Sequence, residues 1–327
     1  MPKQPYLKKD KLIQQVKTKL PDKDTTSVEI NQFLNNISYQ DLFKGYQNTI
    51  LKQNNGNFIK GINLDLLYQI HWLDLSLSEI LLKLSLETEK HLKVQLANII
   101  YGYGKDYPDY LHFRYYKNTS NKVLDKVKDF VDLDSEHYFN KARESFNGCI
   151  PSWYVIYHLS LGQVINWYSI LKPPAKKLMV NSFFDTDVRI NLSDADQKQL
   201  LKTFFDYILE VRNKTAHGNK IAGIRLNTNL QNRLIKQTPF SKYFEKNDSN
   251  VILSNIYNFF VIIIVLSKLE PFSINAVQTV VNYFKYNSSK ENNPLSSLNI
   301  TVYDLYGINH NKLNNLVKMV KHKHYLD

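Results

Sequence analysis

Residues 193–218, SDADQKQLLKTFFDYILEVRNKTAHG, carry the pattern that decides the fold. Ser193, followed three residues later by Asp196, is a helix-start signal, because a serine side chain can accept the amide hydrogen of the third residue after it. Gly218 closes the stretch, and glycine often marks the end of a helix. Between them apolar residues recur at helical spacing: Leu201, Phe204, Phe205, Ile208 and Val211. The pattern predicts one amphipathic helix.

The end of this helix carries the run RNKTAH, in which Arg212 and His217 are separated by four residues. On an ideal helix Arg212 falls one heptad after Phe205 and therefore lies on the apolar stripe. His217 is rotated by roughly 140° from it, onto the polar face. One chain does not easily bring both side chains to one substrate atom. A helix end, or a second copy of the motif across a two-fold axis, is needed.

Three further segments accompany RNKTAH in a fixed order. They are Ser38-Tyr39…Leu42…Gly45-Tyr46, then Asp74…Leu77…Glu89…Leu92-Lys93…Gln95-Leu96-Ala97, then Pro151-Ser152-Trp153…Leu159-Ser160…Gly162…Tyr168…Leu171. Together with the R-x4-H run, they resemble the Abi-like (AbiF/AbiD) abortive-infection proteins of the HEPN ribonuclease superfamily. The resemblance covers roughly residues 10–230. One departure is Gly218, where many relatives carry a second histidine.

Helical periodicity and the scarcity of glycine and proline, ten of each, predict an all-α protein with almost no strand. We expect an antiparallel, HEPN-like helical bundle made by helices at 64–100, 152–171 and 194–213. The expected parts of the chain are an N-terminal helical extension at 1–62, the core at 63–235 and a C-terminal helical subdomain at 236–327. A basic loop after Pro173-Pro174 is expected to lead to the motif helix.

The resemblance implies that Arg212 and His217 are catalytic. Asn213 can orient the histidine or bond a non-bridging phosphate oxygen. Glu89 has two interpretations: a surface ion pair with Lys93 one turn on, or a carboxylate that reaches across the bundle to orient Arg212. The alternative for the motif itself is structural, with both cations placed near a helix end by the helix dipole.

The chemistry of these residues suits RNA cleavage without a metal. The ribose 2′-hydroxyl must be deprotonated, and charge on the phosphorane must be neutralised. Histidine titrates near neutrality, and arginine is a permanent cation matched to phosphate oxygens. The expected products are a 2′,3′-cyclic phosphate and a 5′-hydroxyl, and DNA, which lacks the 2′-hydroxyl, is not a substrate. We expect no metal and no cofactor, since H-E-x-x-H, paired C-x-x-C and the P-loop pattern are missing.

The charge of the chain points to a polyanionic partner. It holds 42 Lys+Arg and 30 Asp+Glu, a net charge of +12. Lysines flank the motif on both sides, and we expect them to contact RNA: Lys176, Lys177, Lys214 and Lys220. Residues 105–150 interleave tyrosines with lysines, which is typical either of single-strand binding or of the solvated face of a helix. A soluble basic protein without such a partner is the alternative.

Two features bear on location. The first dozen residues hold no apolar signal segment, and the single Cys149 suits a reducing cytoplasm, which is the expected location. The most apolar window, 251–266, is short for a membrane span and fits a buried helix, so no membrane contact is expected.

Two functions remain open from the sequence. One is a metal-independent endoribonuclease that acts as a toxin in phage defence, assembled as a homodimer and neutralised by a small non-coding RNA. The other is a non-catalytic HEPN-type module that holds a structured small RNA in the same basic cleft.

Overall fold

The computed structural model describes residues 8–22, 24–46, 48–117, 121–133 and 137–325, and in these ranges the chain is helical with no β-strand. The prediction of an all-α fold is confirmed. The α-helices are α1 (Lys9–Lys19), α2 (Ser27–Asn36), α3 (Leu64–Tyr101), α4 (Asn121–Asp132), α5 (Tyr138–Ser145), α6 (Ser152–His158), α7 (Leu161–Ile170), α8 (Pro173–Phe183), α9 (Thr186–Arg189), α10 (Asp194–Ala216), α11 (Asn232–Lys236), α12 (Ile256–Leu266), α13 (Glu270–Asn287), α14 (Val302–Tyr306) and α15 (His310–His324).

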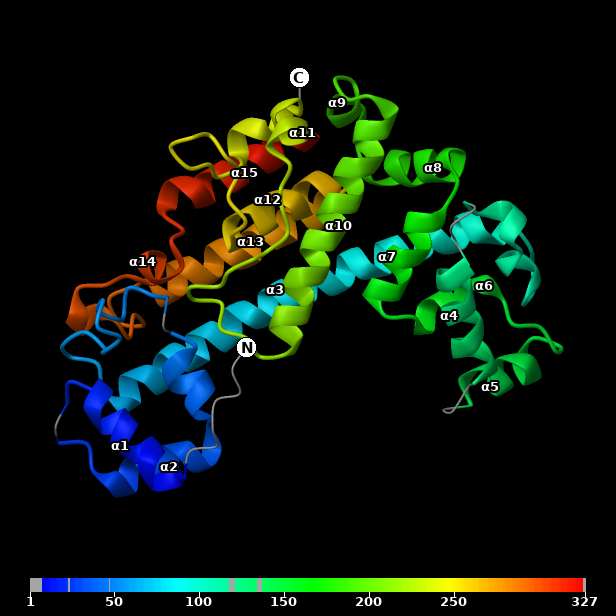
Figure 1. The fold of residues 1–327 in the computed structure, drawn as a ribbon. Helices are drawn as coiled ribbons and strands as arrows, with labels where there is room; N and C mark the ends of the chain where they lie inside the picture. The colour runs from blue at the N-terminus through cyan, green and yellow to red at the C-terminus, as the bar shows by residue number, and fades with distance from the viewer. Residues whose placement is uncertain (1–7, 23, 47, 118–120, 134–136, 326–327) are drawn as a thin grey trace.

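Helix α3 is the axis of the molecule. Asn63 caps its N-terminus by accepting the amide hydrogen of Leu66, and the helix ends at Tyr101 where a glycine-containing run begins. Figure 1 shows α3 running through the fold, with α10 crossing it, α6 to α8 towards one end, and α12 and α13 alongside. Apolar residues recur along α3 at spacings of three and four, and they are buried apart from the partly buried Ile80: Leu66, Ile70, Leu73, Leu77, Ile80 and Leu84. Burial of these residues against several helices stabilises the fold.

The predicted core helix is confirmed as well. All eleven residues of α12 are buried, and α12 packs against α10, α13 and α15. A helix that is apolar on every side must be covered on every side. Among the described helices, none combines the length and the apolar character that a membrane crossing requires.

The single helix expected at 152–171 is wrong, because two helices, α6 and α7, stand in its place. Leu159 and Ser160 adopt extended backbone between them. Ser160 accepts the amide hydrogen of Gln163, while the Gln163 side chain accepts the Ser160 amide hydrogen at 2.9 Å. This reciprocal capping box satisfies two amides at a helix start, so a new helix begins inside the apolar pattern.

The basic loop expected after Pro173-Pro174 is also wrong. Both prolines lie in the first turn of α8, which carries Lys176 and Lys177 on its early turns. Proline has no amide hydrogen, and the first turn of a helix leaves its amides unbonded, so proline is tolerated there. The two prolines therefore start a helix and do not merely end one.

Candidate functional site

The C-terminal end of α10 is built by local sequence. Ser193 caps the helix start, accepting the Asp196 amide hydrogen at 3.1 Å. At the other end the Asn219 amide donates to the Lys214 carbonyl at 2.9 Å and the Gly218 amide to that of Thr215 at 3.1 Å. Gly218 has φ 68°, the left-handed conformation that glycine adopts without strain. This Schellman arrangement stops the helix next to His217, which is its exposed C-terminal cap residue.

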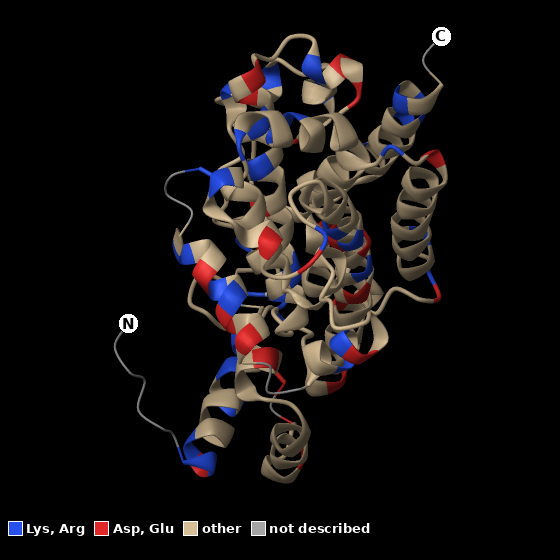
Figure 2. Cartoon of the chain, turned by 90° about the vertical axis from the view of Figure 1, so that its right-hand side faces the viewer, with Lys and Arg blue, Asp and Glu red and all other residues tan. Residues whose placement is uncertain are grey.

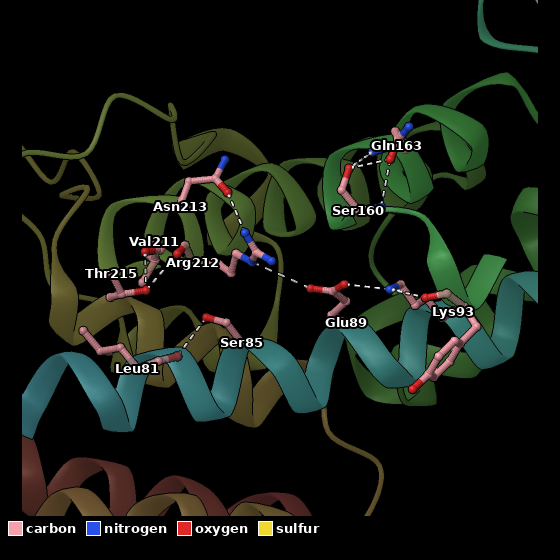
Figure 3. Close-up of polar contacts among 11 residues, drawn as sticks. Leu81, Ser85, Glu89, Lys93, Ser160, Gln163, Val211, Arg212, Asn213 and Thr215 are labelled. Atoms are coloured by element: carbon pink, nitrogen blue, oxygen red, sulfur yellow. Dashed lines mark hydrogen bonds and ion pairs between the residues drawn. The ribbon is translucent and has the colours of Figure 1, made fainter. Parts of the chain in front are cut away.

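Arg212 leans from α10 onto α3. Its Nε lies 3.8 Å from Oε2 of Glu89, and its Nη1 donates to Asn213 Oδ1 at 3.4 Å (Figure 3). The Arg212 side chain is 31% exposed, whereas that of Glu89 is only 8% exposed. The guanidinium is therefore half-buried, with one edge against a buried carboxylate and the rest accessible from solvent.

Glu89 contacts two cations, so the two contacts considered as alternatives occur together, although the pair with Lys93 is largely buried and not on the surface. Lys93 Nζ lies 2.8 Å from Oε1 of Glu89 and also donates to the Tyr157 carbonyl at 3.0 Å. The Glu89 Oε2 and Arg212 Nε atoms are inaccessible to solvent and have no hydrogen-bond partner among the described residues. At 3.8 Å their contact is electrostatic attraction without a hydrogen bond. Lys93 thus fixes the carboxylate, and the carboxylate attracts Arg212.

The two residues of the motif differ in environment. Arg212 lies against α3, while His217 is solvent-exposed at the helix end. This agrees with the rotation expected from their spacing on the helix. The end of α10 can therefore offer a phosphate-binding cation and a proton-transferring imidazole on neighbouring but different faces.

The expected RNA-contacting lysines fall into different environments. Lys214 Nζ lies 3.8 Å from Glu210, and Lys177 Nζ lies 2.7 Å from Asp194. Lys176 is half-buried and donates to the Ser169 carbonyl at 2.5 Å. Lys220 is buried, with its ammonium group on His71. Lys220 therefore has little exposed surface with which to contact RNA.

Glu210 fastens the segment that follows the motif. Its carboxylate accepts the amide hydrogens of Asn227 and Thr228 and the hydroxyl of Thr228, at 2.7–2.9 Å. Burial alone would raise the pKa of Glu210, but these donors and Lys214 hold the pKa below its ordinary value. Residues 227 and 228 are thereby tied to the exposed side of α10.

A second carboxylate, Asp74, fastens the loop immediately after Gly218. Asp74 is 2% exposed and accepts the amide hydrogens of Ile221 at 2.8 Å and Ala222 at 2.7 Å. Burial raises the pKa of Asp74, and the two amides and the Lys220 ammonium oppose that rise. Burial lowers the pKa of Lys220, because it disfavours the charged ammonium group. We call Asp74 with residues 219–222 the loop clamp.

The loop clamp contacts Gly45-Tyr46, which belongs to another of the segments that carry the resemblance. A Cβ on Gly45 would lie 2.4 Å from the Lys220 Cγ, so the chain needs glycine there. The Lys220 ammonium also lies 5.6 Å from the ring centroid of Tyr46, next along the chain. In the sequence, Gly45-Tyr46 and Asp74 stand out only as parts of the family resemblance. The available signal was Asp74 itself, a charge at core spacing between Leu73 and Leu77.

Comparison with known proteins gives one match. The family model described as Abi-like protein matches residues 32–222, which is more than half of the chain. The search of curated proteins found no match, and the search of solved structures found none either. The matched range includes Gly45-Tyr46, Asp74, Glu89 and the whole of the α10 motif. The chain belongs to the Abi-like protein family.

Proposed function

We propose that this protein is a metal-independent RNA endonuclease that acts as a toxin in abortive infection, the phage-defence role that membership of the Abi-like family suggests. The observation that supports it most is Arg212, a half-buried cation attracted by the buried Glu89 at the helix end that also exposes His217. A HEPN-like arrangement of the helices is part of the proposal.

In this mechanism His217 transfers protons to and from the ribose 2′-hydroxyl and the leaving 5′-oxygen. Arg212 binds non-bridging phosphate oxygens and neutralises the charge that develops on phosphorus. Glu89 holds the guanidinium in place from behind, and Asn213 offers its amide beside it. The products are a 2′,3′-cyclic phosphate and a 5′-hydroxyl.

The active form is a homodimer in this proposal. Arg212 and His217 point to different faces of one α10. A second copy of the helix end across a two-fold axis can bring the histidine of one chain to the arginine of the other. Isologous contacts of this kind are the commonest way in which identical chains associate.

The test is cleavage of labelled RNA by the pure protein in EDTA. We expect fragments ending in a cyclic phosphate, and a loss of at least about 10²-fold in rate for Arg212→Ala and His217→Ala, each with an unchanged helical circular dichroism spectrum. If cleavage strictly required magnesium, the metal-independent mechanism would be wrong. If Arg212→Ala unfolds instead, the arginine has a structural role.

The same two variants test the composite site. When Arg212→Ala and His217→Ala proteins are mixed and allowed to exchange, a mixed dimer regains one intact pair, His217 from one chain and Arg212 from the other. Activity should reappear in the mixture. Continued inactivity, with exchange shown by mass, argues against a site shared in this way.

The second candidate is a non-catalytic module that holds a structured small RNA. The basic charge of the chain, +12, supports either function. Bound RNA without cleavage by the wild-type protein in any metal ion would favour this candidate. The two functions are compatible when a small RNA occupies the nuclease site as its antitoxin.

A further inference from the structure

A groove of about 770 Å³ lies away from the Arg212 site, between the end of α3, the turn Phe113–Tyr115 and the start of α8. We call it the α8 groove. Its lining includes Gln95, Tyr103, Arg114, Tyr115, Lys172 and Leu178. Among the described residues that line it there are two cations and no carboxylate.

Two tyrosine rings form one wall of the groove. Tyr103 and Tyr115, the tyrosine pair, stack with centroids 4.8 Å apart and planes 6° from parallel. The Arg114 guanidinium carbon lies 4.7 Å from the Tyr115 centroid, and its Nη2 donates to the Tyr115 hydroxyl at 2.6 Å. Both tyrosines keep part of their surface exposed, unlike Tyr110 and Tyr116 of the same segment, which are core residues. Since Tyr103 and Arg114 both lie against the Tyr115 ring, the flat surfaces left for a ligand are the exposed parts of the two rings and the guanidinium that lies over them.

The cations around the groove lack acidic partners. Lys172 Nζ donates to the Arg114 carbonyl at 2.5 Å, and within the described residues neither Arg114 nor Lys172 forms an ion pair. On the other side of the start of α8, Lys176 approaches Lys117, and burial, followed by Lys117, lowers the pKa of Lys176 to about 7. Figure 2 shows basic and acidic residues interspersed along many of the helices. Unpaired cations gathered at one place attract a polyanion.

The α8 groove and the Arg212 site use different faces of α3. At about 100° per residue, Gln95 and Asn98 are turned by more than 90° from Glu89 and Lys93. The groove also has no residue in common with the loop clamp or with the end of α10. It is a separate surface of the same molecule.

We propose that the α8 groove binds a single-stranded segment of RNA, with bases against the tyrosine pair and phosphates on Arg114 and Lys172. Stacking on aromatic side chains together with backbone contacts from cations is how proteins hold single strands without reading their sequence. That the strand is RNA rests on the proposed function. The groove supplies affinity for the strand and the end of α10 supplies the chemistry.

The test measures binding of fluorescein-labelled oligouridylate to full-length His217→Ala protein by anisotropy across a salt series. Loss of two phosphate contacts in Arg114→Ala/Lys172→Ala should lower the slope of log affinity against log salt by about 1.4. The matched control is Lys60→Ala/Lys285→Ala, which removes two exposed lysines elsewhere and should keep the wild-type slope. Tyr115→Leu should weaken binding at least about fivefold with little change of slope, because stacking carries no charge.

A groove variant whose slope and affinity equal those of the control overturns the proposal, as does a folded Tyr115→Leu protein with unchanged affinity. The binding assay uses protein without the proposed catalytic histidine. Its result is therefore independent of whether the wild-type protein cleaves RNA. Absence of cleavage by the wild type would remove the proposed function and leave the groove result standing.

Discussion

At the scale of single residues, Glu89 decides how Arg212 is presented. A buried carboxylate needs cationic or hydrogen-bonding partners, and Glu89 has Lys93 at 2.8 Å and Arg212 at 3.8 Å. The shorter contact fixes the carboxylate, so the longer one can orient the guanidinium without fully enclosing it. Arg212 therefore keeps 31% of its side chain exposed for a ligand.

We predict that Glu89→Gln lowers the RNA cleavage rate by about 10²-fold, because a guanidinium misplaced by about 1 Å loses the geometry of the reaction. Glutamine keeps the size of the side chain, removes the charge and replaces one carboxylate oxygen with an NH₂ group. The measurement is kcat and KM for labelled RNA, with unfolding in urea as a check on stability. We expect the loss mainly in kcat.

Lys93→Ala is the matched control for Glu89→Gln. It removes the lysine that fixes the Glu89 carboxylate but keeps the charge that attracts Arg212, so its loss of kcat should be smaller than that of Glu89→Gln. If both variants lose kcat equally, Glu89 acts only through the stability of the ion-pair cluster and does not position Arg212.

The sequence offered the two contacts of Glu89 as alternatives, Arg212 through the resemblance and Lys93 through helical spacing. It could not show that both occur together, since that depends on how closely α10 crosses α3. It also could not show that Lys220 is buried, because lysine is almost always exposed when only its residue type is known. The buried position follows from His71, Asp74 and Gly45, which lie far away in the chain.

At the scale of elements, the end of α10 is held from three sides. The Schellman turn at Gly218 ends the helix, the loop clamp holds residues 221 and 222, and Glu210 holds residues 227 and 228. Each of these devices satisfies backbone amides that would otherwise be unbonded. The position of His217 is therefore set by the segment after it as much as by the helix before it.

We predict that Asp74→Asn destabilises the protein by about 1–3 kcal/mol, because an amide oxygen can replace one acceptor while the second backbone amide faces an NH₂ group. The measurement is the free energy of unfolding in urea. Hydrogen exchange should show that the amides of Ile221 and Ala222, in the loop after α10, lose protection before the amides of α3 do.

The control is Asp65→Asn, an exposed aspartate in the first turn of the same helix. Its effect should stay within about 0.5 kcal/mol. Equal effects of the two variants would mean that the two short hydrogen bonds of Asp74 contribute nothing special to stability.

Elements with strong periodicity were predictable: α3 begins at the predicted residue 64 and ends one residue after the predicted end, and α10 begins at the predicted residue 194. The division of 152–171 was not predicted, because the apolar spacing of Ile156, Leu159 and Val164 continues across the capping box. Periodicity reports which side faces the core, and it is insensitive to a break that keeps the same side buried. The four-residue signal at Ser160 and Gln163 was present but weaker than the apolar pattern.

At the scale of the whole molecule, the net positive charge bears on how the proposed nuclease is controlled. With a net charge of +12 we expect the protein to attract RNA at low salt, and the proposed nuclease would then damage its own cell unless it is masked. RNA can serve as the mask, because its phosphates would bind to the same cations as the phosphates of a substrate. The proposed division into 1–62, 63–235 and 236–327 leaves the nuclease site within the middle part, where a bound RNA can reach it.

We therefore predict that protein purified from its native locus carries one discrete small RNA, which gives excess absorbance at 260 nm and a defined gel band. Its affinity should fall steeply with salt, because each phosphate contact contributes about 0.7–0.9 to the slope of log affinity against log salt. Lys176→Ala and Lys214→Ala should reduce both the affinity and this slope while leaving the cleavage of free RNA intact, since neither side chain touches Arg212 or Glu89. Lys220→Ala belongs to a different class, because that lysine is buried and its loss should act on stability. Only heterogeneous RNA fragments in the purified protein, or a tight complex with a protein encoded alongside, would show that the mask is not a small RNA.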